Sequence, residues 1–315
     1  MTAALIFHRV EERHLQKLRA RCPQATFIAC EDTDCLEKHL PEADILVTFK
    51  CDQSMLDRAP NLKWVQALST GVDSFPRSSL SQRDIILTST RGIHARHMAE
   101  YAIAVMVKLA RNLHRIVKNQ TSHAWERFPQ GEIQGKVLAI VGLGSIGREI
   151  ARKAAFLGME VHGVKKHPEK LPDVHSVMGM DGLDHVLGFS DYVINLLPLT
   201  PETENLFNKD RFSGMKEGAC FINMGRGGSV NEDDLVQALQ TNRLGGFVSD
   251  VFKQEPLPAD HPLWDEDKAM ITPHICGEST VYMDKAIPVI ERNIQAFIQG
   301  RIVDMINRVE PEQPY

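Results

Sequence analysis

Short apolar segments alternate with amphipathic segments along the first ninety residues of the chain. The apolar runs occupy residues 4–7, 25–29, 45–49, 64–68 and 85–87. The stretches between them, such as residues 10–18, have the spacing of helices with one apolar face. Strands that alternate with helices are typical of a parallel sheet covered by helices, so this part of the chain predicts an α/β domain.

A second series of apolar runs begins near residue 137. These runs are continuous, as expected for strands buried on both faces, and occupy residues 137–141, 161–164, 192–197, 220–223, 247–251 and 270–272. Six strands with intervening helices predict a complete doubly wound, dinucleotide-binding domain. The nearly all-apolar residues 98–109 predict a helix buried on several sides, between domains or at a subunit interface.

A glycine-rich turn follows the run at 137–141 and precedes a predicted helix. It reads Gly-Leu-Gly-Ser-Ile-Gly at residues 142–147. Gly142 permits a tight turn, Gly144 lets the backbone approach a pyrophosphate, and Gly147 lets helix and strand pack closely. The helix N-terminus offers free N–H groups to an anion, so the turn predicts a dinucleotide site.

The whole pattern predicts two Rossmann-like, doubly wound parallel-sheet domains of the α/β class, with the active site in the cleft between them. Residues 1–97 and 284–315 are assigned to a discontinuous substrate-binding domain, and residues 98–283 to the dinucleotide-binding domain. A helix predicted over residues 279–299 returns the chain to the first domain. No convincing internal sequence repeat is apparent.

Composition excludes some classes of protein. The 315 residues carry a formal net charge of −5, which disfavours nucleic acid as a partner, and no apolar stretch predicts a membrane span. The N-terminus lacks a signal-peptide pattern. The six cysteines form no Cys-x-x-Cys pair, so we expect free thiols and a cytoplasmic location. His94 and His97 could share a helix face, but no third ligand is apparent, and no metal site is expected.

The residues after the strand at 161–164 bear on the choice between NAD and NADP. An acidic residue at this place would hydrogen-bond the adenosine ribose of NAD. Here stand Lys165 and Lys166, which would attract a 2′-phosphate and offer nothing to a free 2′-hydroxyl. We therefore predict a preference for NADP, with NAD possible, and a solvated basic turn as the alternative.

Three further segments, residues 223–227, 249–258 and 271–277, follow predicted strand ends and carry Arg226, Glu255 and His274. Ligands of an open parallel sheet bind beyond the carboxyl ends of its strands, so we expect the three segments to converge. Histidine can donate a proton near neutral pH, a nearby carboxylate favours its charged form, and arginine offers a planar fork to a carboxylate. Each residue alone could equally be structural, but their joint placement favours a catalytic site.

These motifs, in this order, resemble those of the D-isomer-specific 2-hydroxyacid dehydrogenase family, particularly its glyoxylate/hydroxypyruvate reductase branch. The resemblance covers nearly the whole chain and includes residues 195–203 and 261–264. It implies an oxidoreductase that transfers a hydride between NAD(P)H and a small 2-keto acid to give the D-2-hydroxy acid, with Arg226, Glu255 and His274 as catalytic residues. The family usually has alanine at the position of Gly225, a small change that leaves the arginine assignment intact.

The motifs and the resemblance together give a set of predicted binding residues. By resemblance, Asp250 contacts the nicotinamide carboxamide, and the loop at 66–73 binds the substrate carboxylate through backbone N–H groups. The predicted cofactor-binding residues are Gly142, Gly144, Ser145, Ile146, Gly147, Lys165, Lys166, Leu197, Pro198, Thr203, Met224, Gly225, Asp250 and Gly277. The predicted substrate-binding residues are Lys50, Ser69, Thr70, Gly71, Arg226 and His274.

Several alternatives stay open at this point. The substrate could be a bulkier 2-keto acid or a phosphoglycerate-like anion, although no long segment follows Tyr315 as the regulated phosphoglycerate type would require. A non-catalytic, dinucleotide-sensing scaffold similar to the C-terminal-binding-protein corepressors is a third possibility. Beyond the small-molecule acid, the expected partner is a second copy of the chain in a homodimer. Trp125 and Trp264 are possible pocket walls, and by resemblance Trp125 reaches the active site of the partner subunit. Both could equally pack at an interface or in a core.

Overall fold

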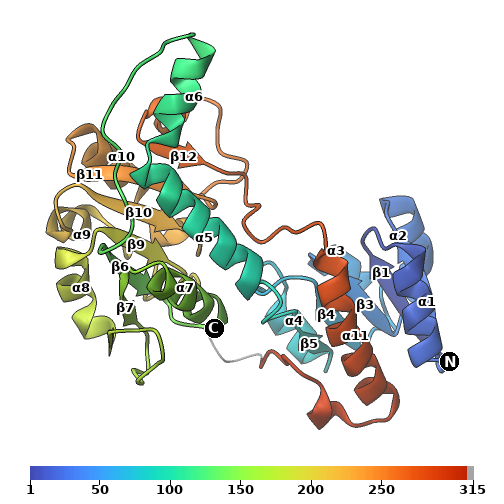
Figure 1. The fold of residues 1–315 in the computed structure, drawn as a ribbon. Helices are drawn as coiled ribbons and strands as arrows, with labels where there is room; N and C mark the ends of the chain where they lie inside the picture. The colour runs from blue at the N-terminus through green and yellow to red at the C-terminus, as the bar shows by residue number, and fades with distance from the viewer. Residues whose placement is uncertain (311–315) are drawn as a thin grey trace. The chain divides into compact units, whose positions relative to one another are not determined.

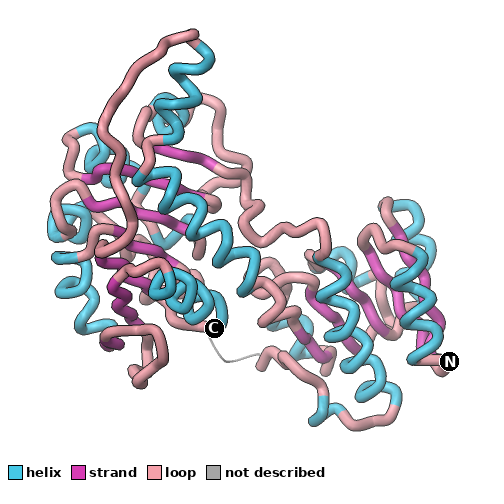
Figure 2. The backbone as a smooth tube through the Cα atoms, in the orientation of Figure 1, coloured by secondary structure: helices cyan, strands magenta, loops and turns pink. Residues whose placement is uncertain are grey.

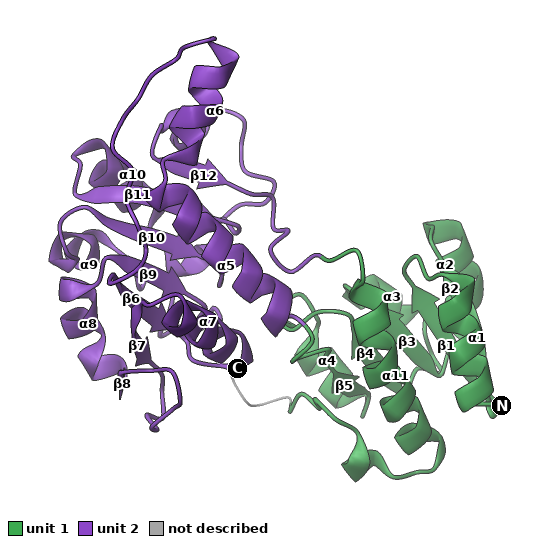
Figure 3. Ribbon diagram, viewed as in Figure 1, with its two compact units in different colours: residues 1–93, 279–315 green, residues 94–278 purple. Residues whose placement is uncertain are grey.

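The computed structural model describes residues 1–310, which form two compact α/β units (Figure 3). Among the described residues, unit 1 comprises Met1–Ile93 and residues 279–310, and unit 2 comprises His94–Glu278. The two divisions of the chain lie a few residues earlier than the domain boundaries that the sequence predicts. The last five residues, 311–315, which the sequence assigns to the first domain, lie outside the described part.

Unit 1 contains a five-stranded parallel sheet of order β2-β1-β3-β4-β5 (Figure 1). Its strands are β1 (Thr2–Phe7), β2 (Ala25–Cys30), β3 (Ile45–Thr48), β4 (Trp64–Ala67) and β5 (Ile86–Thr88). Its helices are α1 (Glu12–Arg21), α2 (Thr33–His39), α3 (Gln53–Asp57), α4 (Arg77–Gln82) and α11 (Tyr282–Ile298). All five predicted strands are confirmed. Helix α11 buries Met283, Ile287, Ile290 and Ile294 in one core with side chains of β1 and β3.

Unit 2 contains a seven-stranded parallel sheet of order β12-β11-β10-β9-β6-β7-β8. Its strands are β6 (Val137–Val141), β7 (Glu160–Val164), β8 (Ser176–Met178), β9 (Tyr192–Asn195), β10 (Ala219–Asn223), β11 (Leu244–Ser249) and β12 (Ala269–Ile271). Its helices are α5 (Ala95–Ala110), α6 (Leu113–Thr121), α7 (Ser145–Phe156), α8 (Leu183–Phe189), α9 (Lys209–Gly214) and α10 (Glu232–Gln240). The six predicted strands are confirmed, whereas β8 at the sheet edge and helix α6 were not predicted.

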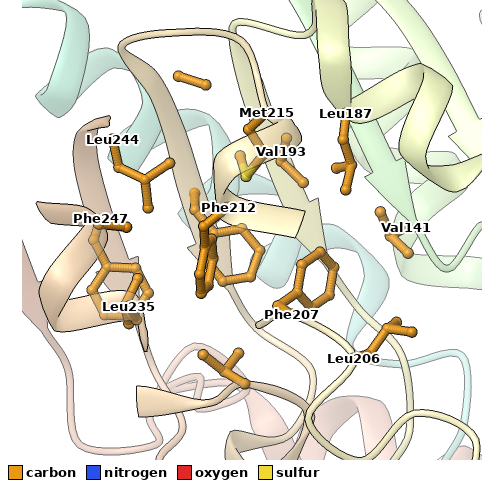
Figure 4. Close-up of a cluster of buried hydrophobic side chains, with 14 of the residues drawn as sticks. Val141, Leu187, Val193, Leu206, Phe207, Phe212, Met215, Leu235, Leu244 and Phe247 are labelled. Carbon is orange, nitrogen blue, oxygen red and sulfur yellow. The ribbon is translucent and has the colours of Figure 1, made fainter. Parts of the chain in front are cut away.

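Helices cover both faces of the unit 2 sheet (Figure 2). On one face, Phe207, Phe212 and Phe247 pack with side chains of α8 and α10 (Figure 4). On the other face, α5 lies against α7 through a cluster that includes Ala102 and Ala151. Residues 98–109 were predicted to be buried on several sides, and within the chain α5 buries one stripe of side chains: Met98, Ala99, Ala102, Val105 and Met106.

The cysteines correct one prediction. Cys30, at the end of β2, and Cys35, in α2, form a disulfide across the strand-to-helix turn, so the expectation of six free thiols was wrong for this pair. Their Cα atoms lie 5.4 Å apart, a separation that suits a disulfide. The remaining four cysteines are free thiols. Across residues 1–310, no helix combines the length and the apolar character needed to span a membrane.

Candidate active site

The loops that follow the strands of unit 2 meet at one edge of its sheet, because all these strands run in the same direction. Strands β10, β11 and β12 are neighbours in the sheet. The loop after β10 carries Arg226, the loop after β11 carries Glu255, and the loop after β12 carries His274. The sheet order thus gathers these three residues where ligands of open α/β sheets bind.

His274 and Glu255 form a hydrogen-bonded pair. Glu255 Oε2 lies 2.8 Å from His274 Nδ1, and Glu255 Oε1 accepts the Phe252 N–H at 2.9 Å. An ionised carboxylate only accepts hydrogen bonds, so Nδ1 carries a proton, and Nε2 is the ring atom left for proton transfer. The histidine side chain keeps 53% of its surface exposed within the described structure, which leaves it accessible to a ligand.

The side chain of Asp250 forms hydrogen bonds with the residues on both sides of His274. His274 has φ +55°, in the left-handed region that non-glycine residues rarely occupy. The carboxylate of Asp250 is fully buried, and its Oδ1 accepts hydrogen bonds from Thr272 Oγ1 at 2.5 Å and from the Ile275 N–H at 2.9 Å. Its Oδ2 accepts the Cys276 N–H at 2.9 Å. Asp250, which the sequence assigned to the nicotinamide carboxamide, therefore directs both oxygens into the loop that carries His274, residues 272–277, called the histidine loop below.

The free thiol of Cys276 lies beside this carboxylate. Burial raises the pKa of the Cys276 thiol, and the negative charge of Asp250 adds to the rise. A thiol that keeps its proton is a poor nucleophile. The chemistry of this loop therefore falls to His274.

The two histidines considered as metal ligands are used in another way. The rings of His94 and His97 lie 5.6 Å apart, and His97 Nε2 donates to the Gly277 carbonyl at 2.8 Å. Within residues 1–310, no group of three or more His, Cys, Asp or Glu side chains is arranged to hold a metal ion. His97 thus fastens the far end of the loop that carries His274.

A buried amide network, which the sequence did not predict, fixes the turn of Arg226. Asn195 Nδ2 donates to Asn223 Oδ1 at 2.9 Å and to Ser229 Oγ at 2.8 Å. Ser229 Oγ in turn donates to the Arg226 carbonyl at 2.6 Å. The signal in the sequence was an asparagine at the end of two apolar runs, where the strands β9 and β10 end.

Two glycines flank Arg226 and bring neighbouring segments into contact with its turn. A Cβ added at Gly225 would lie 2.6 Å from the Leu197 carbonyl oxygen, and one at Gly227 would lie 1.9 Å from the Phe252 carbonyl carbon. The Arg226 turn is therefore packed directly against the loop that also carries Glu255. The alanine that the family usually has at position 225 would require a small shift of the backbone here.

The glycine turn after β6 has the geometry of a phosphate cradle. Gly142 has φ +108°, and a Cβ at Gly147 would lie 2.6 Å from the Gly142 carbonyl oxygen. A Cβ at Gly144 would meet nothing within 4 Å, so this side of the turn is open. Ser145 and Ile146 are the first two residues of helix α7, and their backbone N–H groups therefore lack hydrogen-bond partners within the helix. The open side and these N–H groups fit a dinucleotide diphosphate.

The predicted phosphate-binding lysines follow β7. Lys165 Nζ lies 2.6 Å from Glu169 Oε1, and Arg148 Nη2 on helix α7 lies 2.6 Å from the same oxygen. The hydrogen bond from Lys165, with help from Arg148, holds the pKa of Glu169 below its usual range. Arg148 was not predicted, and it adds a cation beside Lys165, while Lys166 is exposed next to it in the chain.

The remaining predicted cofactor residues occupy the same edge of the sheet. Leu197 and Pro198 follow β9, and Thr203 Oγ1 donates to the Pro198 carbonyl at 2.7 Å, which folds the segment back on itself. Met224 is buried directly after β10. Gly277, whose carbonyl accepts from His97, ends the histidine loop.

The predicted substrate residues that are not catalytic lie in unit 1. Lys50 follows β3 and is exposed, and the half-buried Ser69, Thr70 and Gly71 follow the neighbouring strand β4. Ser69 Oγ donates to the Gly71 carbonyl at 2.6 Å and so tightens this turn. The four residues therefore share the carboxyl edge of the unit 1 sheet.

The two tryptophans considered as pocket walls differ in exposure. Trp125 is 97% exposed, whereas Trp264 is about half exposed and donates from Nε1 to the Pro258 carbonyl at 2.8 Å. Trp264 is therefore tied to the loop that carries Glu255, and Trp125 is not covered within the chain.

Comparisons with known proteins agree with this arrangement. Residues 103–276 match the family model described as D-isomer specific 2-hydroxyacid dehydrogenase, NAD binding domain. Glyoxylate/hydroxypyruvate reductase A of Serratia proteamaculans is 30% identical over 306 residues, which cover 94% of this chain and 95% of that protein.

Solved structures of complete chains are also similar. A D-isomer specific 2-hydroxyacid dehydrogenase family protein from Aeromonas salmonicida is 32% identical with a TM-score of 0.90, and the match covers 99% of both chains. The NADPH-dependent glyoxylate/hydroxypyruvate reductase of Sinorhizobium meliloti, solved with NADP and sulfate, is 26% identical with a TM-score of 0.83 over 99% of both chains.

Proposed function

The chain belongs to the D-isomer-specific 2-hydroxyacid dehydrogenase family, and on that premise we propose that it reduces a small 2-keto acid of the glyoxylate or hydroxypyruvate type to the D-2-hydroxy acid. The observation that carries the proposal is the His274–Glu255 pair at 2.8 Å, at the sheet edge that also holds Arg226 and the glycine turn. The Serratia and Sinorhizobium relatives, which are named as reductases of these acids, support the choice of substrate.

The chemistry assigns a separate task to each residue of the triad. The bound reduced nicotinamide supplies a hydride to the carbonyl carbon of the keto acid. His274 donates the Nε2 proton to the carbonyl oxygen, and Glu255 stabilises the charged ring on the side of Nδ1. Arg226 binds the substrate carboxylate and polarises the carbonyl. In the opposite direction, His274 accepts the proton of the hydroxy acid.

NADPH is the proposed cofactor. The backbone of residues 142–147 would hold the diphosphate, and Lys165 and Lys166, together with Arg148, would bind the 2′-phosphate. Further contacts to the cofactor would come from the remaining predicted residues, which follow β9 and β10 or end the histidine loop: Leu197, Pro198, Thr203, Met224, Gly225 and Gly277. Asp250 would act through the loop that it holds. The Sinorhizobium reductase, which contains NADP, supports this cofactor.

The substrate carboxylate is proposed to bind the turn formed by Ser69, Thr70 and Gly71, with Lys50 as an additional cation. Backbone N–H groups in such a turn suit an anion. The cytoplasmic location predicted from the sequence stays a prediction.

A homodimer is proposed because unit 2 presents an apolar surface on and after α6. Leu113, Ile116, Val117 and Trp125 are 40%, 43%, 62% and 97% exposed. An exposed apolar patch of this kind is typical of a protein–protein interface. Sedimentation equilibrium should give twice the chain mass for the wild type and a monomer for a Val117→Asp/Trp125→Asp variant. A monomeric wild type would contradict the proposed homodimer.

The first test of the function is a spectrophotometric assay. Purified protein is mixed with NADPH or NADH, and the loss of absorbance is followed with glyoxylate, hydroxypyruvate, pyruvate, phenylpyruvate and 3-phosphohydroxypyruvate. Turnover with glyoxylate or hydroxypyruvate and a higher kcat/KM for NADPH than for NADH is expected. Turnover only with a bulkier or phosphorylated acid would overturn the substrate class. Tight cofactor binding without any turnover would favour a dinucleotide-sensing scaffold.

A further inference from the structure

Helix α5 holds the loop that carries His274 from outside the catalytic triad. His97 Nε2 donates to the Gly277 carbonyl at 2.8 Å, after the histidine. The Tyr101 hydroxyl lies 2.7 Å from Thr272 Oγ1, before the histidine. Residues 97 and 101 are four apart and so lie on the same face of the helix. The helix therefore fixes both ends of a loop whose middle carries the proposed proton donor.

The direction of the hydrogen bonds from Tyr101 follows from their donors. The Thr272 hydroxyl has a single proton, and it is donated to the Asp250 carboxylate at 2.5 Å. The hydrogen bond at 2.7 Å must then be donated by Tyr101 to Thr272. Burial raises the pKa of Tyr101, so it keeps its proton throughout the working range of pH. Tyr101, Thr272 and Asp250 thus form one directed, largely buried series of hydrogen bonds.

This series ends on the backbone next to the catalytic ring. Asp250 accepts the N–H groups of Ile275 and Cys276, the two residues that follow His274. His274 occupies a left-handed backbone conformation, which costs free energy for any residue except glycine and persists only where its surroundings hold it. The orientation of the ring toward Glu255 depends on that conformation.

We propose that Tyr101 is a positioning residue that acts through Thr272 and Asp250 to hold His274 in its left-handed conformation and in register with Glu255. The proposal rests on the proposed role of His274 as proton donor. Tyr101 lies on α5, more than 170 residues from His274 in sequence, and its hydrogen bond goes to Thr272 rather than to the triad. A displaced proton donor loses rate steeply, because catalytic groups act only within a narrow range of geometry.

Kinetics of Tyr101→Phe test the proposal, since this variant keeps the ring and removes only the hydroxyl. We expect kcat for keto-acid reduction to fall about three- to tenfold, which is the worth of one hydrogen bond, while the Kd of NADPH stays within about twofold.

Matched variants separate positioning from general destabilisation. Thr272→Val should reproduce the loss of kcat, and Thr272→Ser, which keeps a hydroxyl, should restore most of it. The control is Tyr192→Phe, which removes the hydroxyl of a buried tyrosine in the apolar cluster against which Tyr101 packs. Tyr192 makes no hydrogen bond to the histidine loop among residues 1–310, so the kinetics of this variant should equal those of the wild type.

Nitrogen-15 NMR of the histidine rings gives a readout that does not need turnover. The His274 signals are identified by their absence in His274→Gln, and at constant pH their chemical shifts should change in Tyr101→Phe but not in Tyr192→Phe. Wild-type kinetics and an unmoved His274 signal in Tyr101→Phe would overturn the positioning role. If the wild type reduced no keto acid, the proposed function would fail, while the NMR comparison would still decide the role of Tyr101.

Discussion

In each sheet an aspartate links the amino ends of neighbouring strands, whereas the loops at the carboxyl ends differ between the two sheets. In unit 1, Asp44 stands directly before β3, and its Oδ2 accepts the Ala3 N–H at the start of β1 at 2.9 Å. Its Oδ1 lies 2.8 Å from Lys63 Nζ, directly before β4. One carboxylate thus joins the starts of three neighbouring strands.

Unit 2 repeats the arrangement. Asp191 stands directly before β9, its Oδ2 accepts the Val137 N–H at the start of β6 at 2.9 Å, and its Oδ1 lies 2.8 Å from Lys216 Nζ. The strand order β2-β1-β3-β4-β5 of unit 1 also corresponds to β7-β6-β9-β10-β11 of unit 2. The structure therefore contains a repeat that the sequence did not make apparent.

The carboxyl edges are not alike. In unit 2, β6 leads into the glycine turn at 142–147, and the loops after β10, β11 and β12 carry the triad. In unit 1, β1 leads into the segment His-Arg-Val-Glu at residues 8–11, which has no glycine with which to cradle a phosphate. The comparison teaches that the amino edge of each sheet carries contacts that hold the strands together, whereas the loops at the carboxyl edge can carry binding and catalytic residues.

The largest expected effect lies at the carboxyl edge of unit 2. His274→Ala and Arg226→Ala should each lower kcat about 10²- to 10⁴-fold, the range of a lost proton donor or electrostatic contact, without lowering the melting temperature. Steady-state kinetics and thermal unfolding measure the two quantities. The control is His185→Ala, a histidine exposed on α8. Near-normal turnover in either catalytic variant would remove that residue from the mechanism.

A smaller loss is expected where the Arg226 turn contacts the Glu255 loop. Gly227→Ala would place a Cβ 1.9 Å from the Phe252 carbonyl carbon, so the two segments must separate. We expect kcat to fall about tenfold or more and the free energy of unfolding to fall by about 1–3 kcal/mol, as for other overpacked sites. In the control, Gly214→Ala, the added Cβ meets nothing within 4 Å. Wild-type activity in Gly227→Ala would show that the contact is not needed for catalysis.

The next effect concerns the cofactor. Replacing Lys165 and Lys166 by serine should raise the KM for NADPH about tenfold and leave the KM for NADH unchanged, because only NADPH carries the 2′-phosphate. Lys170→Ser, an exposed lysine of the same loop, is the matched control. An equal change for both cofactors would mean that the lysines do not recognise the phosphate.

The smallest effect is expected at the amino edges. Burial raises the pKa of Asp44 and Asp191, but hydrogen bonds from a lysine and a backbone N–H outweigh it and hold both pKa values below their usual range. Asp44→Asn and Asp191→Asn should each lower the free energy of unfolding at pH 7 by about 1–2 kcal/mol, with little effect on turnover.

The pH dependence of these two variants follows from the direction of the shifts. A lowered pKa in the folded state stabilises the protein above the unfolded value of about 3.9, and this contribution is lost as the pH falls through the folded value. Urea unfolding at pH 7 and near pH 3 should therefore show a gap from wild type that closes in acid. A gap in only one of the two units would break the equivalence of their amino edges.

The sequence predicted the parts of the fold that depend on apolar pattern. Eleven apolar runs became strands, because a strand covered on both faces reads as a continuous apolar run. Strand β8 was missed because its three residues, Ser176–Met178, begin with a polar serine and so form too short an apolar run. Helix α6 escaped because its apolar residues are exposed rather than packed within the chain.

The parts of the site that could be predicted are those in which the residue type alone indicates a catalytic role. Arg226, Glu255 and His274 are polar residues at strand ends, and parallel strands bring such ends together. Tyr101 and Thr272 were not predicted, because their roles depend on a contact between a helix and a loop that are distant in sequence. The pairing of Cys30 with Cys35 was missed for a similar reason, since the turn between β2 and α2 sets the distance between them.

Because helix α11 belongs to unit 1, the two units are completed at different times during synthesis. Unit 2 is one continuous segment, so it can fold as soon as it leaves the ribosome. The first 93 residues emerge earlier, yet the side chains that complete one of their cores belong to α11, including Met283, Ile287 and Ile290. Until that helix is made, the nascent sheet carries an uncovered apolar face, the kind of surface that chaperones bind. The unit that begins the chain is therefore the last to be finished.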